Sequence, residues 1–451
     1  MAFISETSDD GSNGGDPTKN LQQEKEDNQN ENPQQVEELH NENPQQVEEN
    51  PPIPQEEEEI HNENPQEADE NLPIRQEEEE IHNDNPQEVE ENLPIPQELP
   101  IDLIVSIVAL IPRCHYPSLS LVSRAFRQVI TLHELYLTRS NLGFTEPVLY
   151  AFIGFPPYIP PSWFFLRRSN LGFPLQLGII RSLPPMFPAA AVVTIGYKIY
   201  LMGGYNSLVE YRPVSTVVVI DCRFHTWGYL QNMRRARYHA AAGVNDGNIY
   251  VIGGCKKRDD DWVEVFNVTT ETWATVPSQC PEDASENGEF ITYVVMQGRI
   301  FILELGGCFT YEPRKGLWQS WGVLSELMRY WHSSSSCVVG DLLYTLDLTC
   351  SRGHPIVVYY PNELVWRPVQ GVYSYNLPIL SYNWSKMANF GGKLVILSGG
   401  YSLWFKDIWC IEIALETRQG NQIWGVVESI SLVFRDVMMA PSIELCRTVT
   451  F

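Results

Sequence analysis

Apolar and polar positions divide the chain into three unlike parts. Residues 1–98 contain few large apolar side chains, residues 99–143 have apolar positions at helical spacing, and the rest forms short alternating runs that indicate strands. From Ile101 to Ile111 nearly every position is apolar, which predicts a short helix that is buried on all sides. Pro100 suits the first turn of this helix, and Pro112 ends it.

Two further helices are expected in the same segment. The second begins at Tyr116-Pro117-Ser118, and the third runs from about Leu132 to Gly143, a residue that is favourable at a helix C-cap. A segment of about 45 residues is near the lower limit for burying a core unaided. The surplus apolar surface of the first helix therefore predicts a partner protein. The alternative is a helical hairpin buried against its own domain.

From about Ala189 onward the strand pattern repeats. Four units have an apolar strand followed by Gly-Gly: IYLMGG at 199–204, IYVIGG at 249–254, IFILELGG at 300–307 and LVILSGG at 394–400. Downstream of a further alternating strand, each of five units has a tryptophan: Trp227, Trp273, Trp318, Trp366 and Trp424. The spacing of about 45–58 residues is typical of propeller blades. We predict that Gly-Gly supplies a turn with positive φ after the second strand of a blade, and that the tryptophan packs between neighbouring blades.

The array departs from this pattern in two places. The fourth unit reads LLYTLDLT at 342–349 and has no Gly-Gly, and after Trp424 the chain has room for only two or three strands. Residues 144–183 read as a Pro-rich connector, in which Trp163-Phe164-Phe165-Leu166 forms a short strand. That strand is the candidate to complete a composite sixth blade, although a five-bladed closure stays open. The propeller is expected over residues 184–451.

Two parts of the chain resemble known families. Leu99-Pro100-x-Asp102-Leu103-Ile104, followed by the block from Pro117 to Arg127 (PSLSLVSRAFR), looks like an F-box, and the repeat array resembles kelch repeats. Together they resemble plant F-box/kelch-repeat proteins. The resemblance implies a mainly β fold, a kelch-type β-propeller of five to six blades preceded by a three-helix F-box at 99–143.

An F-box implies docking onto the Skp-type adaptor of a cullin–RING ubiquitin ligase. The residues expected to bind the adaptor are Leu99, Pro100, Leu103, Ile104, Ile107, Leu119, Val122, Ser123 and Phe126. The propeller is then expected to hold an unknown target protein for ubiquitination. Two alternatives stay open, a kelch scaffold that does not assemble a ligase and a propeller that binds a small molecule in its channel.

In kelch propellers the loops that enter the first strand of each blade line one mouth of the channel. Here these loops contain Arg237-Tyr238-His239 and Arg329-Tyr330-Trp331-His332, with Tyr382-Asn383-Trp384 in the fifth unit. Arginine and aromatic residues are enriched at protein-binding hot spots, so we predict that the first two groups bind the target. The alternative is that many of these side chains pack within the propeller.

Charge is concentrated in the first 98 residues. They contain 30 Asp+Glu and 3 Lys+Arg, a net charge of −27, which leaves 27 acidic and 28 basic residues downstream. Such a tail, with phrases repeated about every 21 residues, is predicted to be disordered. The nearly neutral remainder gives no indication of nucleic-acid binding.

The sequence also indicates where the protein acts and that it is not an enzyme. We expect no signal peptide; the sequence has no apolar run of the ~18–20 residues that span a bilayer, and its nine cysteines form no CxxC pairs. These features predict a reducing compartment, the cytoplasm and/or the nucleus, and no membrane contact. Because no P-loop, nucleophile motif or metal-ligand spacing is present, we expect a non-catalytic subunit without metal or cofactor.

Overall fold

The structure is a computed structural model, and parts of the chain are described in it. The described residues are 99–156, 159–167, 175–206, 212–257, 260–277, 280–322, 324–331, 334–351, 353–380, 384–401, 406–436 and 440–451. The predicted disordered tail, residues 1–98, lies outside them. None of the helices in the described ranges combines the length and apolar character that crossing a membrane requires.

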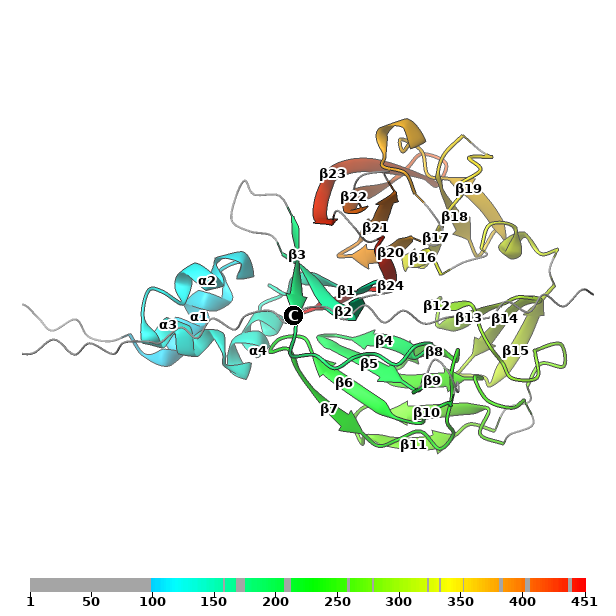
Figure 1. The fold of residues 1–451 in the computed structure, drawn as a ribbon, viewed down its shortest axis with the longest axis horizontal. Coiled ribbons are helices and arrows are strands. Elements are labelled where there is room, and N and C mark those ends of the chain that lie inside the picture. The colour runs from blue at the N-terminus through cyan, green and yellow to red at the C-terminus, as the bar shows by residue number, and fades with distance from the viewer. Residues whose placement is uncertain are drawn as a thin grey trace, which may run out of the picture. The chain divides into compact units, whose positions relative to one another are not determined.

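Residues 99–143 fold into four short α-helices and one 3-10 turn (Figure 1). They are α1 (Ile101–Ala109), η1 (Arg113–His115), α2 (Tyr116–Leu119), α3 (Arg124–Ile130) and α4 (His133–Asn141). The prediction of three helices is therefore wrong, because the expected second helix is interrupted. Ser123 has extended backbone angles and caps α3, and its side chain accepts a hydrogen bond from the N–H of Phe126 at 3.3 Å. The C-cap after α4 is confirmed, since Gly143 has φ +72°.

Six four-stranded antiparallel sheets form a β-propeller, here numbered blades 1 to 6. Blade 1 contains β4 (Ala191–Ile195), β5 (Lys198–Met202), β6 (Val217–Asp221) and β7 (Thr226–Leu230), and blade 2 contains β8 (Ala241–Asn245), β9 (Asn248–Ile252), β10 (Val263–Asn267) and β11 (Thr272–Thr275). Blade 3 contains β12 (Thr292–Met296), β13 (Arg299–Glu304), β14 (Gly307–Glu312) and β15 (Leu317–Trp321), and blade 4 contains β16 (Ser336–Val339), β17 (Leu342–Leu346), β18 (Ile356–Tyr360) and β19 (Val365–Pro368). Blade 5 contains β20 (Ser385–Phe390), β21 (Lys393–Tyr401), β22 (Lys406–Arg418) and β23 (Gln422–Asp436).

Blade 6 joins the two ends of the propeller. It consists of β24 (Ser442–Thr450), β1 (Pro147–Phe155), β2 (Ile159–Arg167) and β3 (Gln176–Ile180), in that order. The composite sixth blade is thus confirmed, and a five-bladed closure is excluded. The strands of this blade are shared between the two ends differently from the prediction. The segment before blade 1 supplies three strands, and the end of the chain supplies only one.

The Pro-rich stretch at 144–183 is therefore mostly blade rather than connector. Pro160 and Pro161 obscured this in the sequence, because proline cannot donate a ladder hydrogen bond. On the β1 side, both prolines fall where the β1–β2 register shifts, between Ile153 and Phe155. On the β3 side, they precede Trp163, the first residue of β2 that pairs with β3. No ladder bond is needed from either proline at that position.

The innermost strands β4, β8, β12, β16, β20 and β24 contact one another around a central channel. Each blade buries apolar faces against its neighbours. Trp273, for example, lies in a cluster built from blades 1 and 2, and Trp366 lies in one built from blades 3 and 4. Packing of the tryptophan between blades is confirmed there. Trp227 is less covered, with an exposed fraction of 41%, but its Nε1 still donates to the carbonyl oxygen of Ser182, after blade 6, at 3.1 Å.

The Gly-Gly prediction holds in two of the four repeats. Gly203 and Gly204 have φ of +67° and +97°, and the pair in blade 2 is also positive. A Cβ on Gly203 would lie 2.4 Å from the carbonyl oxygen of Arg237, so glycine is needed there for close approach as well. In blade 3, by contrast, Gly307 already begins β14, and in blade 5 Gly399 stays paired with Ile408 inside the sheet. The expected positive φ is wrong at those two pairs.

Candidate functional site

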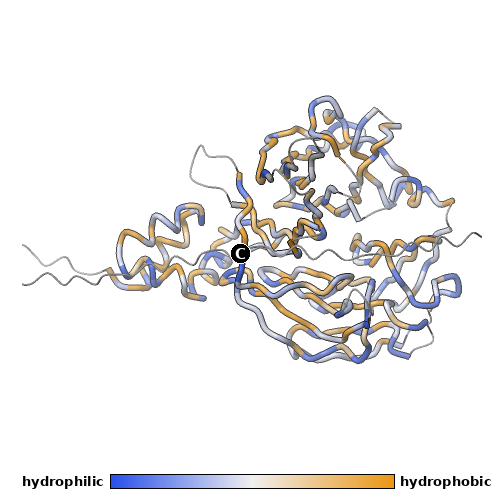
Figure 2. The backbone as a smooth tube through the Cα atoms, in the orientation of Figure 1, coloured by the Kyte–Doolittle hydropathy of each residue, from blue (hydrophilic) through white to orange (hydrophobic). Residues whose placement is uncertain are grey.

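Helix α1 has one buried and one exposed apolar face. Ile104, Val105 and Val108 lie in the core of the helical segment and are at most 3% exposed. Leu103, Ile107 and Leu110, spaced i, i+4 and i+7, have exposed fractions of 46%, 38% and 55%. The prediction that this helix is buried on all sides is therefore wrong. Figure 2 shows hydrophobic and hydrophilic stretches along these helices.

Exposed apolar side chains at this end form a candidate surface. We call Leu103, Ile107 and Leu110 the apolar stripe, and Leu99 and Ile101 at the start of the helix are exposed as well. Leu121 and Val122, in the turn between α2 and α3, are also exposed, at 79% and 65%. Large apolar side chains gathered on one face of a small helical unit are typical of a protein-binding site.

The predicted adaptor-binding residues divide into three groups in the structure. The exposed ones are Leu99, Pro100, Leu103, Ile107, Val122 and Ser123. Leu119 and Phe126 are half-buried and pack against the core of the helical segment. Ile104 is 3% exposed and belongs to that core, so the structure places it inside the helical segment rather than on its exposed surface. Sequence reasoning missed Ile101, Leu110 and Leu121, although the spacing of Leu110 from Leu103 indicates the shared face.

Arg139 on α4 connects the helices to one another and to the propeller. Its side chain is 1% exposed, and Nη1 donates to the carbonyl oxygens of Ala109 and Ile111 at 3.1 and 2.7 Å and to the hydroxyl of Tyr116 at 3.1 Å. Its Nη2 donates to the carbonyl oxygen of Phe144 and to Oε1 of Glu146, both at 2.6 Å. Sequence reasoning missed this residue, because nothing local distinguishes it from a surface arginine.

The junction between the helical segment and the propeller is also packed with aromatic rings. Tyr136 of α4 contacts the rings of Phe224 and Phe451 at centroid distances of 5.3 and 5.9 Å. The guanidinium of Arg113 lies 4.0 Å from the centroid of Phe451. Glu146 and Phe451 exchange backbone hydrogen bonds at 3.0 and 3.2 Å. The helical segment is therefore fixed to the propeller by more than a flexible linker.

Comparison with known proteins agrees with this architecture. A family model of the F-box domain matches residues 96–138, and one of the FKB95 kelch-repeats domain matches residues 163–434. The chain belongs to the F-box/kelch-repeat family. An F-box/kelch-repeat protein of Arabidopsis thaliana is 71% identical over 356 residues, which are 78% of this chain and 91% of the relative. A putative F-box/kelch-repeat protein of the same plant is 47% identical over 453 residues, 100% of each chain.

The side of the kelch propeller next to the F-box follows from the connections. Phe224 lies in the turn between the third and fourth strands of blade 1, β6 and β7. In an antiparallel blade this turn is at the opposite end of the strands from the loop that enters the first strand. The loops predicted to bind a target are therefore on the face of the propeller away from the F-box.

Arg237, in the loop that enters blade 2, is fully buried rather than exposed to a target. Its guanidinium pairs with Glu264, with 2.8 Å between Nη2 and Oε1, and both side chains are 0% exposed. It also donates to the carbonyl oxygens of Gly253 at 2.5 Å and of Trp262 at 3.1 Å. The structure places Arg237 inside the propeller rather than at its surface, because the arginine holds the loop to the β9–β10 turn of blade 2, the blade that the loop enters.

The neighbouring residues remain accessible. His239 is exposed and Tyr238 is half-buried. Tyr238 donates a hydrogen bond to the carboxylate of Glu289, and this bond raises the pKa of Tyr238 to about 12.

The loop that enters blade 4 is similarly divided. Trp331 and Tyr330 are 0% and 7% exposed, and the structure places them in the core between blades 3 and 4 rather than at the surface of the loop. Arg329 is exposed. His332 lies outside the described residues, as do Tyr382 and Asn383 of the fifth unit.

Proposed function

We propose that the protein is the substrate-recognition subunit of a Skp–cullin–F-box ubiquitin ligase. The observation that carries this proposal is the apolar stripe, because it stays exposed after the F-box has formed its own core. An F-box domain in general implies a Skp-type adaptor as partner. Burying leucine and isoleucine side chains contributes about 1.5–3 kcal/mol each when they are covered fully, so a partner that covers the stripe gains a sizeable free energy.

In this proposal the protein is non-catalytic. The kelch propeller holds a target protein through the loops opposite the F-box, among them those with Tyr238, His239 and Arg329. The transfer of ubiquitin is done by other subunits, and the receptor accelerates it by proximity. We further propose that this takes place in the cytoplasm and/or the nucleus.

Capture of a purified Skp-type adaptor tests the proposal. Leu103→Asp places a charge in the apolar stripe, where a desolvated interface does not tolerate it. Leu305→Asp is the matched control, because Leu305 is 89% exposed and lies in the β13–β14 turn of the propeller. Wild type and Leu305→Asp should capture the adaptor, and Leu103→Asp should not. Failure of wild type to capture any of several adaptors would leave a kelch scaffold that does not assemble a ligase.

A further inference from the structure

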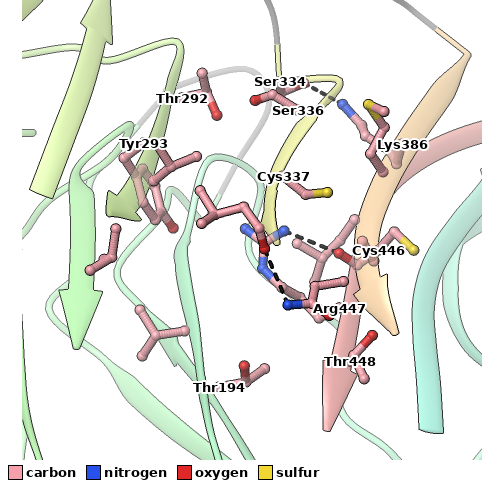
Figure 3. Close-up of a pocket in the computed structure, with 18 of the residues that line it drawn as sticks. Thr194, Thr292, Tyr293, Ser334, Ser336, Cys337, Lys386, Cys446, Arg447 and Thr448 are labelled. Carbon is pink, nitrogen blue, oxygen red and sulfur yellow. Dashed lines mark hydrogen bonds between the residues drawn. The ribbon is translucent and has the colours of Figure 1, made fainter. Parts of the chain in front are cut away.

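The central channel of the propeller contains a cavity of about 370 Å³ that is lined by all six innermost strands (Figure 3). This volume is within the range of small-molecule sites. The cavity has polar groups at the end where the chain enters the inner strands, namely Thr292, Ser334, Ser336 and Lys386. Its remaining walls are partly apolar, with Val244, Val294 and Val338 among them.

Three charged side chains line this cavity: Lys386 on β20, and Glu444 and Arg447 on β24. Two cations and one carboxylate leave a formal charge of +1. The ion pairs within 4.0 Å among the described residues include none that joins Lys386 or Arg447 to a carboxylate. Lys386 donates a hydrogen bond to the hydroxyl of Ser334, and Nη1 of Arg447 donates to the carbonyl oxygen of Cys446 at 3.1 Å.

The electrostatics of the cavity leave one cation in excess of the carboxylate of Glu444. Burial lowers the pKa of Lys386, and the charge of Arg447 lowers it further. Burial raises the pKa of Glu444, and Lys386 opposes that effect. A bound anion would relieve the repulsion between the two cations, and it would be attracted more strongly here than on the surface because the cavity is partly shielded from water.

We propose that the channel binds a small organic monoanion, with Lys386 and Arg447 as its cationic partners. The hydroxyl of Ser334, which accepts from Lys386, and the hydroxyl of Thr292 on the cavity wall are further candidate donors. The net charge of +1 matches a single negative charge, and the valine walls match a short hydrocarbon body better than a bare inorganic ion. This inference goes beyond the adaptor and target binding proposed above and does not depend on them.

Calorimetric titration of the full chain with hexanoate tests the inference. Hexanamide is a neutral probe of the same shape, and inorganic phosphate is an anion without a hydrocarbon body. Hexanoate should bind more tightly than either. Lys386→Met should weaken hexanoate by about tenfold or more, because a hydrogen bond to a charged group is lost. Lys393→Met is the matched control, since Lys393 is a surface residue paired with Glu428, and it should leave hexanoate binding unchanged.

Glu444→Gln is a second variant, and it should change the affinity for hexanoate in the opposite direction from Lys386→Met. Removing this carboxylate leaves the two cations unopposed, so hexanoate should bind several-fold more tightly than to wild type. The inference is overturned if wild type does not distinguish hexanoate from hexanamide, or if Glu444→Gln fails to tighten binding in a protein that still melts as wild type does.

Discussion

Replacing Arg139 by methionine should loosen the F-box more than any substitution at its surface. The side chain is 1% exposed and donates five hydrogen bonds, to three carbonyl oxygens, one hydroxyl and the carboxylate of Glu146. Methionine fills similar space but donates to none of these acceptors. Removing one partner of a buried ion pair costs about 3–5 kcal/mol, and the part-exposed Glu146 places the expected loss toward the lower end of that range.

Hydrogen exchange measured by mass spectrometry is the suitable assay, because it reports the F-box separately from the propeller. If amides of α1 and α4 exchange through opening of the F-box, a loss of about 3 kcal/mol should speed their exchange about 100-fold. Arg127→Met is the matched control, since Arg127 is exposed and donates one hydrogen bond, to the carbonyl oxygen of Ser120 at 3.1 Å. Exchange in α1 that is equal in the two variants would refute the role assigned to Arg139.

Three further predictions concern the propeller. Gly254→Ala should lower the urea midpoint of unfolding more than Gly247→Ala does. Both glycines have positive φ, but only at Gly254 would an added Cβ lie 2.6 Å from a carbonyl oxygen. Equal midpoints for the two variants would contradict this. Trp366→Phe should cost at least about 1 kcal/mol in urea unfolding, since it removes the hydrogen bond from Nε1 to the carbonyl oxygen of Glu326 at 2.7 Å and leaves space in the core between blades 3 and 4; no loss would contradict both contributions. Burial raises the pKa of Tyr200 from 10.0 to about 12, so the folded protein keeps a proton that the unfolded chain releases. The free energy of unfolding should therefore fall as the pH rises from 10 to 12, and a Tyr200→Phe variant that falls equally would exclude this residue as the cause.

The fold could be predicted from the sequence more completely than the functional sites could. Apolar strands ending in Gly-Gly and tryptophans at a blade-like spacing were enough to predict a propeller, because each blade must repeat the same packing with its neighbours. What the repeat could not reveal was that the upstream chain supplies three of the four strands of blade 6, since those strands lie outside the repeat array and β2 has Pro160 and Pro161 near its start. Pairing between segments so distant in sequence leaves no local pattern.

The sites show the same limit at the level of single side chains. The composition of a loop does not reveal whether an arginine points outward, and Arg237 points inward because Glu264 on β10 of the same blade offers a buried partner. Ile104 and Leu103 are adjacent and equally apolar, yet only the helix direction places one in the core and the other in the apolar stripe. Arg139 could not be found at all, because its acceptors lie up to 30 residues away along the chain.

The most direct measurement of the central claim is calorimetric titration of a Skp-type adaptor into the purified full chain at several temperatures. If the apolar stripe is the docking surface, the adaptor should bind in a 1:1 ratio with a negative heat-capacity change, as burial of apolar surface requires. Absence of binding by the folded wild-type chain, or binding with a heat-capacity change near zero, would contradict the account.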